Sequence, residues 1–122
     1  MYKNQVIGIK GEEIARSYFR SLGYKIIKTN YRCRQGEIDI IAKDLVSKEL
    51  IFTEVKTRTS FNYGMPAEAV NKNKQKHIVS ATKYYTYKNN LFNQFIRFDV
   101  IEILIKDKIY LKHNKNCEFY EL

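Results

Sequence analysis

The spacing of apolar residues along the chain predicts two helices. The first spans about Asn4 to Leu22, and one of its faces carries a stripe at helical spacing made of Gly8, Glu12, Ala15, Phe19 and Leu22. Gly23 follows directly, and glycine commonly ends a helix. The second helix is predicted over about Ala67 to Lys88. Its core-facing stripe consists of Ile78, Thr82 and Tyr85.

Five shorter runs are rich in β-branched and aromatic residues, which favours strands. They span Tyr24–Tyr31, Glu37–Lys43, Leu50–Arg58, Phe95–Ile105 and Ile109–His113. Alternation in the second run predicts Ile38, Ile40 and Ala42 on one face, with Glu37, Asp39 and Ile41 on the other. Residues 60 to 66 predict a loop. The order helix, three strands, helix, two strands predicts an α/β fold, a mixed sheet of about five strands flanked by helices.

Composition and charge narrow the class of protein. The chain has 122 residues, of which 44% are hydrophobic, and one proline, so we expect a single domain over residues 1–122. No apolar run approaches the roughly 20 residues that a membrane helix needs, and the N-terminus lacks the apolar stretch of a secretory signal. These features predict a cytoplasmic protein without a membrane partner. The net charge of +9 favours a polyanionic partner, although lysine-rich proteins also occur without any binding role.

The two cysteines are widely separated in the sequence. Cys33 and Cys117 form no metal-ligand pattern, and only His77 and His113 could join them. We therefore expect two reduced thiols and no zinc site.

Two acidic residues lie inside apolar strands. Asp39 lies in GEIDIIA at 36–42, and Glu54 lies in LIFTEVK at 50–56. A buried carboxylate is costly unless it is paired, hydrogen-bonded or bound to a metal, and two neighbouring carboxylates repel each other when both are ionised. Two carboxylates, the backbone carbonyl of Val55 and several waters would complete an octahedral Mg²⁺ site. Lys56, on the same face as Glu54, could orient an attacking water and counter developing negative charge.

The spacing also permits a structural interpretation. Glu54 and Lys56 could form an ion pair on one face of the strand, with Asp39 at a strand end. Glu12 is the only charged residue on the first helical stripe. It could contact a metal or a metal-bound water, or it could lie at the edge of the face and reach solvent.

The acidic strands resemble a known nuclease motif. GEID at 36–39 followed by EVK at 54–56 resembles the core motif of the PD-(D/E)XK nuclease superfamily. More narrowly, the chain is similar to the bacterial YraN-like family, which resembles archaeal Holliday junction resolvases. The matching segments, in order, are GE at 11–12 with Ala15 and Tyr18, GY at 23–24, NYR at 30–32, GEIDIIA at 36–42, FTEVKTR at 52–58, AV at 69–70 and RFDV at 97–100. Two positions depart from the pattern: Ile38 replaces proline, and Thr53 replaces the more usual apolar residue.

The resemblance implies a restriction-endonuclease-like core and a set of roles. It implies that Asp39 and Glu54 bind Mg²⁺ or Mn²⁺, that Lys56 is the catalytic lysine, and that Glu12 is the acid on the first helix. The implied reaction is hydrolysis of phosphodiester bonds in DNA. By similarity to the resolvases, the substrate could be branched DNA and the assembly a homodimer.

Other charged residues are candidates for contacts with nucleic acid. These are Arg32, Arg34, Arg58, Lys72, Lys76 and Lys83, although solvated turns and helix faces would account for them equally well. Arg97 and Asp99 share a strand face and are expected to form a structural ion pair. Two other functions remain open. One is a catalytically inactive nucleic-acid-binding module of the same fold, and the other is a protein whose basic surface binds an acidic partner.

Overall fold

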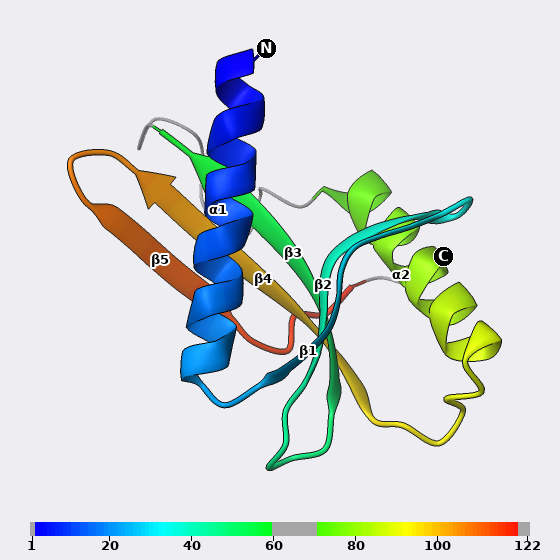
Figure 1. Ribbon diagram of the computed structural model, residues 1–122. Helices are drawn as coiled ribbons and strands as arrows, with labels where there is room; N and C mark the ends of the chain where they lie inside the picture. The colour runs from blue at the N-terminus through cyan, green and yellow to red at the C-terminus, as the bar shows by residue number, and fades with distance from the viewer. Residues whose placement is uncertain (1, 60–70, 120–122) are drawn as a thin grey trace.

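The computed structural model describes residues 2–59 and 71–119. Its elements are α1 (Tyr2–Ser21), β1 (Lys25–Cys33), β2 (Gly36–Lys43), β3 (Leu50–Arg58), α2 (Lys72–Lys88), β4 (Ile96–Ile105) and β5 (Ile109–Asn114), as Figure 1 shows. This order confirms the predicted α/β fold with two helices and five strands. The predicted loop at 60–66 and residues 67–70 of the second predicted helix lie outside the described residues. Within the described ranges, no helix is long and apolar enough to cross a membrane.

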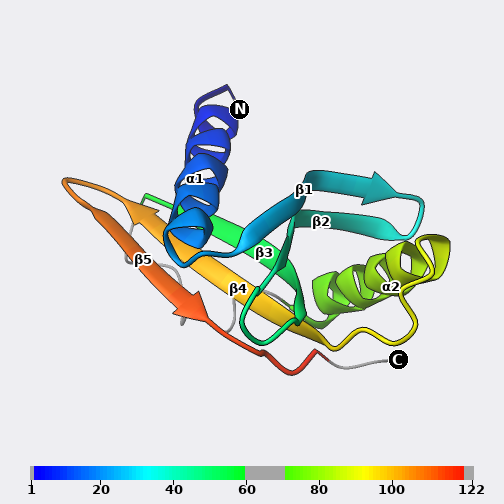
Figure 2. The same ribbon diagram turned by 60° about the horizontal axis from the view of Figure 1, so that its bottom comes forward.

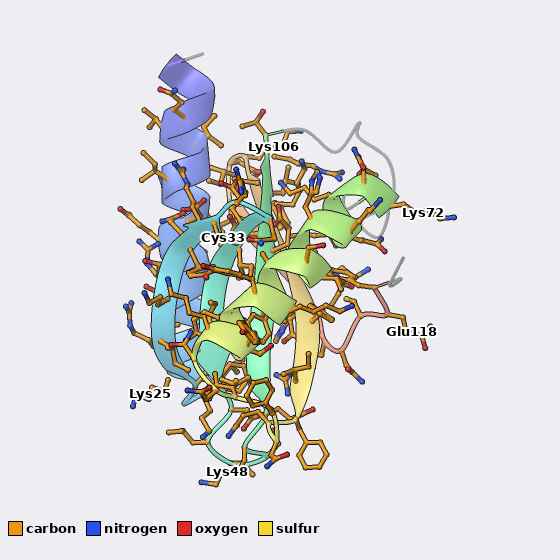
Figure 3. All side chains as sticks on the ribbon, turned by 90° about the vertical axis from the view of Figure 1, so that its right-hand side faces the viewer. Lys25, Cys33, Lys48, Lys72, Lys106 and Glu118 are labelled. Atoms are coloured by element: carbon orange, nitrogen blue, oxygen red, sulfur yellow. The ribbon has the colours of Figure 1, made fainter. Side chains whose placement is uncertain are left out.

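The five strands form one mixed sheet in the order β1-β2-β3-β4-β5. Only β3 and β4 run parallel, and the other neighbouring pairs are antiparallel. Because parallel neighbours need a crossover, α2 lies between β3 and β4 in the chain. Figure 3 shows α1 and α2 on opposite sides of the sheet.

Each helix covers its own hydrophobic cluster. The cluster beneath α1 consists of Ala15, Phe19, Tyr24, Ile40, Ala42, Ile51, Val55, Ile101 and Ile103. The cluster beneath α2 consists of Ile38, Ile41, Leu50, Phe52, Ala81 and Tyr85. The predicted core-facing stripe of α2 is confirmed, because Ile78, Thr82 and Tyr85 are all buried.

The end of α1 follows from Gly23. Its positive φ of 82° allows the N–H groups of Gly23 and Tyr24 to donate to the carbonyls of Arg20 and Phe19, a Schellman motif. The predicted helix end at Gly23 is therefore confirmed. Leu22 was predicted on the core-facing stripe, but it lies within this capping turn and its side chain is 44% exposed.

A second glycine brings α1 close to the sheet. A Cβ atom at Gly11 would collide with the side chain of Thr57 on β3. The helix can therefore approach β3 only because this position has no side chain. This close approach places Glu12, the next residue, beside the end of β3.

The simple alternation predicted for β2 is wrong at one point. Ile38 packs with Ile41 beneath α2, whereas Ile40 and Ala42 pack beneath α1. The regular pairing of β2 with β3 covers Ile40 to Lys43 and does not include Asp39. Beyond that point β2 no longer follows the pleat of its neighbour, so the alternation of faces changes.

The predicted ion pair of Arg97 and Asp99 is confirmed as part of a larger buried network. Arg97 Nε donates to Asp99 Oδ1 at 3.1 Å, and its guanidinium also reaches Glu49 at 3.1 Å and the Tyr24 hydroxyl at 2.8 Å. Asp99 Oδ2 lies 2.7 Å from His113 Nε2. These contacts hold together the α1 face of the sheet. Asp99 is aligned with Thr53, one residue before Glu54 on β3, and neighbouring positions on a strand face opposite sides of the sheet.

Candidate functional site

The four residues predicted to be catalytic line one cavity. It has a volume of about 600 Å³ and lies where α1, the start of β2, the end of β3 and the first turn of α2 meet. The predicted residues on its wall are Glu12, Asp39, Glu54 and Lys56. Val55 and Arg58 of β3 also line it, and so does Lys74 of α2. The fold therefore brings together residues from four separate elements.

The two strand carboxylates are buried at the point where β2 and β3 separate. Asp39 is 9% exposed and Glu54 is 3% exposed. Asp39 Oδ2 accepts a hydrogen bond of 2.8 Å from the backbone N–H of Val55. The Asp39 carboxylate thus accepts the N–H of Val55 beyond the last regular pair of β2 and β3. This hydrogen bond fixes the carboxylate next to Glu54.

Burial and mutual repulsion change the protonation of this pair. Burial, reinforced by the negative charge of Glu54, raises the pKa of Asp39 to about 7. The hydrogen bond from Val55 and the charge of Lys74 act in the opposite direction and only partly offset these effects. At neutral pH, Asp39 is therefore only partly ionised, and a cation would relieve its repulsion with Glu54.

Glu12 extends the acidic cluster from the helix side. Burial and then the charge of Asp39 raise the pKa of Glu12, against the lowering effects of a hydrogen bond with Asn30 and the charge of Arg16. The interpretation in which Glu12 faces the strand carboxylates is favoured over the one in which it only reaches solvent, because it lines the same cavity as Asp39.

Lys74 is the site residue that sequence reasoning missed. Its ammonium lies 2.9 Å from Glu54 Oε1, with the lysine side chain 42% exposed and the glutamate side chain 4% exposed. Burial alone would lower the pKa of Lys74, but the hydrogen bond and charge of Glu54, with the charge of Asp39, raise it. Within the described ranges, the ion-pair partner of Glu54 is Lys74, so the proposed structural pair of Glu54 with Lys56 is wrong.

The position of Lys74 follows from the start of α2. Asn71 caps this helix with an extended backbone, and its side chain accepts the N–H of Lys74 at 2.9 Å. Lys74 lies one helical turn before Ile78, in line with the buried stripe of α2 at its exposed end. Extending that stripe back by four residues would have identified it from the sequence.

The donor set fits a magnesium or manganese ion better than a softer metal. Within residues 2–59 and 71–119, no three His, Cys, Asp or Glu side chains form a ready-made metal site. Mg²⁺ commonly binds through one or two carboxylates and completes its shell with water and substrate phosphate. Asp39 and Glu54 meet that requirement, and Val55 lies on the same cavity wall. Both cysteines are free thiols, and Cys33 and Cys117 line no part of this cavity.

The structure separates the candidate nucleic-acid contacts into three groups. Arg58 lines the main cavity, whereas Arg32 and Arg34 line hollows beside the tip of the β1–β2 hairpin. The three helix lysines, Lys72, Lys76 and Lys83, are exposed and line none of these hollows. Lys72 points away from the sheet in Figure 3. Glu37 is exposed and pairs with Arg32 at 3.3 Å.

The fold and the cavity define a class of protein: an α/β domain with an acidic cavity at the end of a mixed sheet. The chain belongs to the family described as uncharacterised protein family UPF0102, whose model matches residues 11–103. This result confirms the predicted YraN-like family. The matched range includes every acidic residue of the cavity and Lys74.

Clostridial relatives cover most of the chain. A UPF0102 protein of Clostridioides difficile (strain 630) is 48% identical over 105 residues, which cover 86% of this chain and 90% of the relative. One from Clostridium botulinum (strain 657) is 47% identical, covering 85% and 84%. A UPF0102 protein of Caldanaerobacter subterraneus subsp. tengcongensis is 44% identical, covering 83% and 81%.

Proposed function

We propose that this protein is a metal-dependent endonuclease of the PD-(D/E)XK superfamily, with a restriction-endonuclease-like core, that hydrolyses phosphodiester bonds in DNA. The observation that carries this proposal is the buried pair of Asp39 and Glu54, which lines one cavity with Lys56. The Lys74 ammonium pairs with Glu54, yet the pKa of Asp39 stays raised to about 7, so this one charge does not offset the burial of two carboxylates. A bound metal ion would account for the presence of both carboxylates in the core.

The proposed roles follow from position. Asp39 and Glu54 would hold Mg²⁺ or Mn²⁺, which when bound supplies Lewis-acid chemistry to a phosphodiester. Lys56 would hydrogen-bond to the attacking water and counter the negative charge that develops on the phosphate. Arg58, two residues farther along β3, would hold a flanking phosphate by charge-assisted hydrogen bonds. Glu12 would hold a water on the α1 side of the cavity.

Cleavage of defined DNA tests this proposal. The substrates are linear duplex, single-stranded, flapped and four-way DNA, each with Mg²⁺, with Mn²⁺ and with chelator. We expect metal-dependent cleavage of at least one substrate, and loss of that cleavage in Lys56→Ala with binding largely retained. Lys25→Ala is the matched control, because it removes the same charge at an exposed position that lines none of the three hollows.

Two outcomes would contradict the proposal. If Lys56→Ala cleaves as fast as the parent protein, the catalytic assignment is wrong. If the parent protein binds DNA but cleaves none of the substrates with either metal, the alternative of an inactive nucleic-acid-binding module holds instead. Branched DNA as the preferred substrate, and a homodimer that cuts it symmetrically, are the finer parts of the proposal.

A further inference from the structure

Two smaller hollows continue the main cavity along α2. Each has a volume of about 380 Å³. The first shares Glu37 and Lys74 with the main cavity, and the second shares Arg32 and Cys33 with the first. The three hollows therefore share wall residues from the carboxylates to the tip of the β1–β2 hairpin, and together they are called the groove. Figure 2 shows this hairpin projecting from the rest of the sheet, with α2 running beside it.

The walls of this groove are packed against each other. A Cβ atom at Gly36 would come within 2.7 Å of the backbone carbonyl oxygen of His77, so the hairpin rests directly on α2. The rings of Tyr31 and Tyr85 meet edge to face, with their centroids 5.2 Å apart. The groove is thus bounded by two elements that pack directly on each other, and walls already in place lower the entropic cost of binding.

The lining of the groove combines positive charge with aromatic rings. Arg34 and Lys88 are exposed on its outer part, and Lys88 Nζ lies 5.7 Å from the centre of the Tyr84 ring. His77 adds an exposed imidazole nearer the carboxylates. Proteins bind unpaired nucleic acid with this combination, because cations hold the phosphates and aromatic rings stack on the bases.

We propose that the groove holds an unpaired strand of DNA as that strand leaves the candidate active site. This inference rests on the proposed function and extends it to the form of the substrate. The strand's phosphates contact Arg32, Arg34 and Lys88, and one of its bases packs on Tyr84. An unpaired strand fits better than a duplex, because a duplex keeps the faces of its bases inside its own stack and has none to offer to Tyr84.

Binding in chelator tests the groove separately from catalysis. The double variant Arg34→Ala/Lys88→Ala is compared with Lys25→Ala/Lys108→Ala, which removes the same charge at two exposed positions outside the groove. Fluorescence anisotropy is measured over a salt series with single-stranded DNA, blunt duplex, and duplex with a single-stranded arm. On single-stranded DNA, each lost phosphate contact should shallow the plot of log affinity against log salt by about 0.7. The groove variant should therefore lose about 1.4 of slope, and the control pair should keep the parent slope.

A second pair of variants tests stacking. Tyr84→Ala should weaken binding of single-stranded DNA by at least about fivefold, whereas Tyr84→Phe, which keeps the ring, should bind as the parent does. Both should bind blunt duplex with parental affinity. Thermal melts of all variants show whether the fold is retained. If Tyr84→Ala fails to fold, the Arg34→Ala/Lys88→Ala slope decides the question alone.

Each result supports or overturns the groove assignment. Equal salt slopes for the groove variant and the control pair would overturn it, as would an equal loss on blunt duplex, or a parent protein that binds no single-stranded DNA. The proposed function fails in a different way. If the groove variant binds single-stranded DNA more weakly but the parent protein cleaves no DNA with either metal, the groove assignment stands. The proposed nuclease function then fails.

Discussion

Asp39 and Asp99 are both buried aspartates of the same sheet, and their replacement by asparagine should change stability in opposite directions. Asp39→Asn keeps the shape of the side chain and removes one negative charge. Its amide oxygen can still accept the N–H of Val55, and its amide nitrogen can donate to Glu54 as protonated Asp39 does. The variant therefore resembles the protonated form of the site at every pH.

The sign follows from the direction of the pKa shift. The pKa of Asp39 is raised to about 7 in the folded protein, so the folded state holds a proton that the unfolded chain has already released. Stability from this group is greatest at low pH and is lost as the pH rises towards 7. Between pH 5 and 7, the loss amounts to about 2–3 kcal/mol, since each pH unit is worth about 1.36 kcal/mol. Asp39→Asn should escape this loss.

Denaturant unfolding in chelator at pH 5 and pH 8 measures the effect. The free energy of unfolding of Asp39→Asn relative to the parent should rise by about 2–3 kcal/mol between the two pH values. Millimolar Mg²⁺ or Mn²⁺ should then stabilise the parent at pH 8, by about 1.4 kcal/mol at ten times its dissociation constant, and should stabilise Asp39→Asn little.

Asp99→Asn serves as the contrasting control. Burial alone would raise the pKa of Asp99, but hydrogen bonds from His113 and the backbone of Asn116, together with Arg97, lower it. The stabilising effect of ionised Asp99 is therefore present at neutral pH. Asp99→Asn should lower the free energy of unfolding there by about 3 kcal/mol, the low end for a broken buried ion pair. The loss is no larger because Arg97 keeps its contacts with Glu49 and Tyr24. The metal-site hypothesis fails if Asp39→Asn is destabilised in the same way at pH 8 and metal leaves the parent unchanged.

Three further predictions concern Lys74, Gly11 and assembly. Lys74→Met leaves the buried Glu54 without its ion-pair partner. Its free energy of unfolding in chelator should therefore fall by about 1–2 kcal/mol, a value reduced because the lysine is partly exposed. Mn²⁺ should raise the melting temperature of this variant more than that of the parent. An equal rise in both proteins would separate Lys74 from the metal site. Gly11→Ala should destabilise the protein by about 1–3 kcal/mol in denaturant unfolding, because its Cβ would collide with Thr57, and unchanged stability would show that the helix can move away. Sedimentation at working concentration should show a two-fold homodimer, and a strict monomer that cuts four-way junctions symmetrically would contradict this.

The fold was predictable because its apolar pattern is regular over most of its length. Alternation in β3 correctly separates Ile51 and Val55, which pack beneath α1, from Phe52, which packs beneath α2. Alternation failed in β2 at Asp39, where the strand leaves its regular pairing with β3. There the Asp39 carboxylate, in place of a backbone carbonyl, accepts the N–H of Val55. Such a change of register depends on the neighbouring strand and leaves no periodic signal in the sequence.

The candidate site was predictable in its acids and less so in its cations. Asp39 and Glu54 stand out because each interrupts an apolar strand, and the cavity brings them together with Glu12. Lys74 does not stand out, because lysines also occupy positions 72 and 76 beside it. Lys74 differs from these two lysines because it is in line with the buried stripe of α2, and the pattern of charges alone does not show this. The partners of Arg97 other than Asp99 lie 48 to 73 residues away in the chain, so spacing could not reveal them.

The parallel pairing of β3 with β4 has a consequence for synthesis of the chain. Every acidic residue of the cavity, Lys56 and Lys74 precede residue 96, where β4 begins. A ribosome that stops early would therefore release a fragment that carries all of them but leaves the edge of β3 unpaired. That edge is apolar and buried in the intact protein, so it would pair with other chains. Chains that end before β4 should therefore aggregate, although they carry every acidic residue of the cavity.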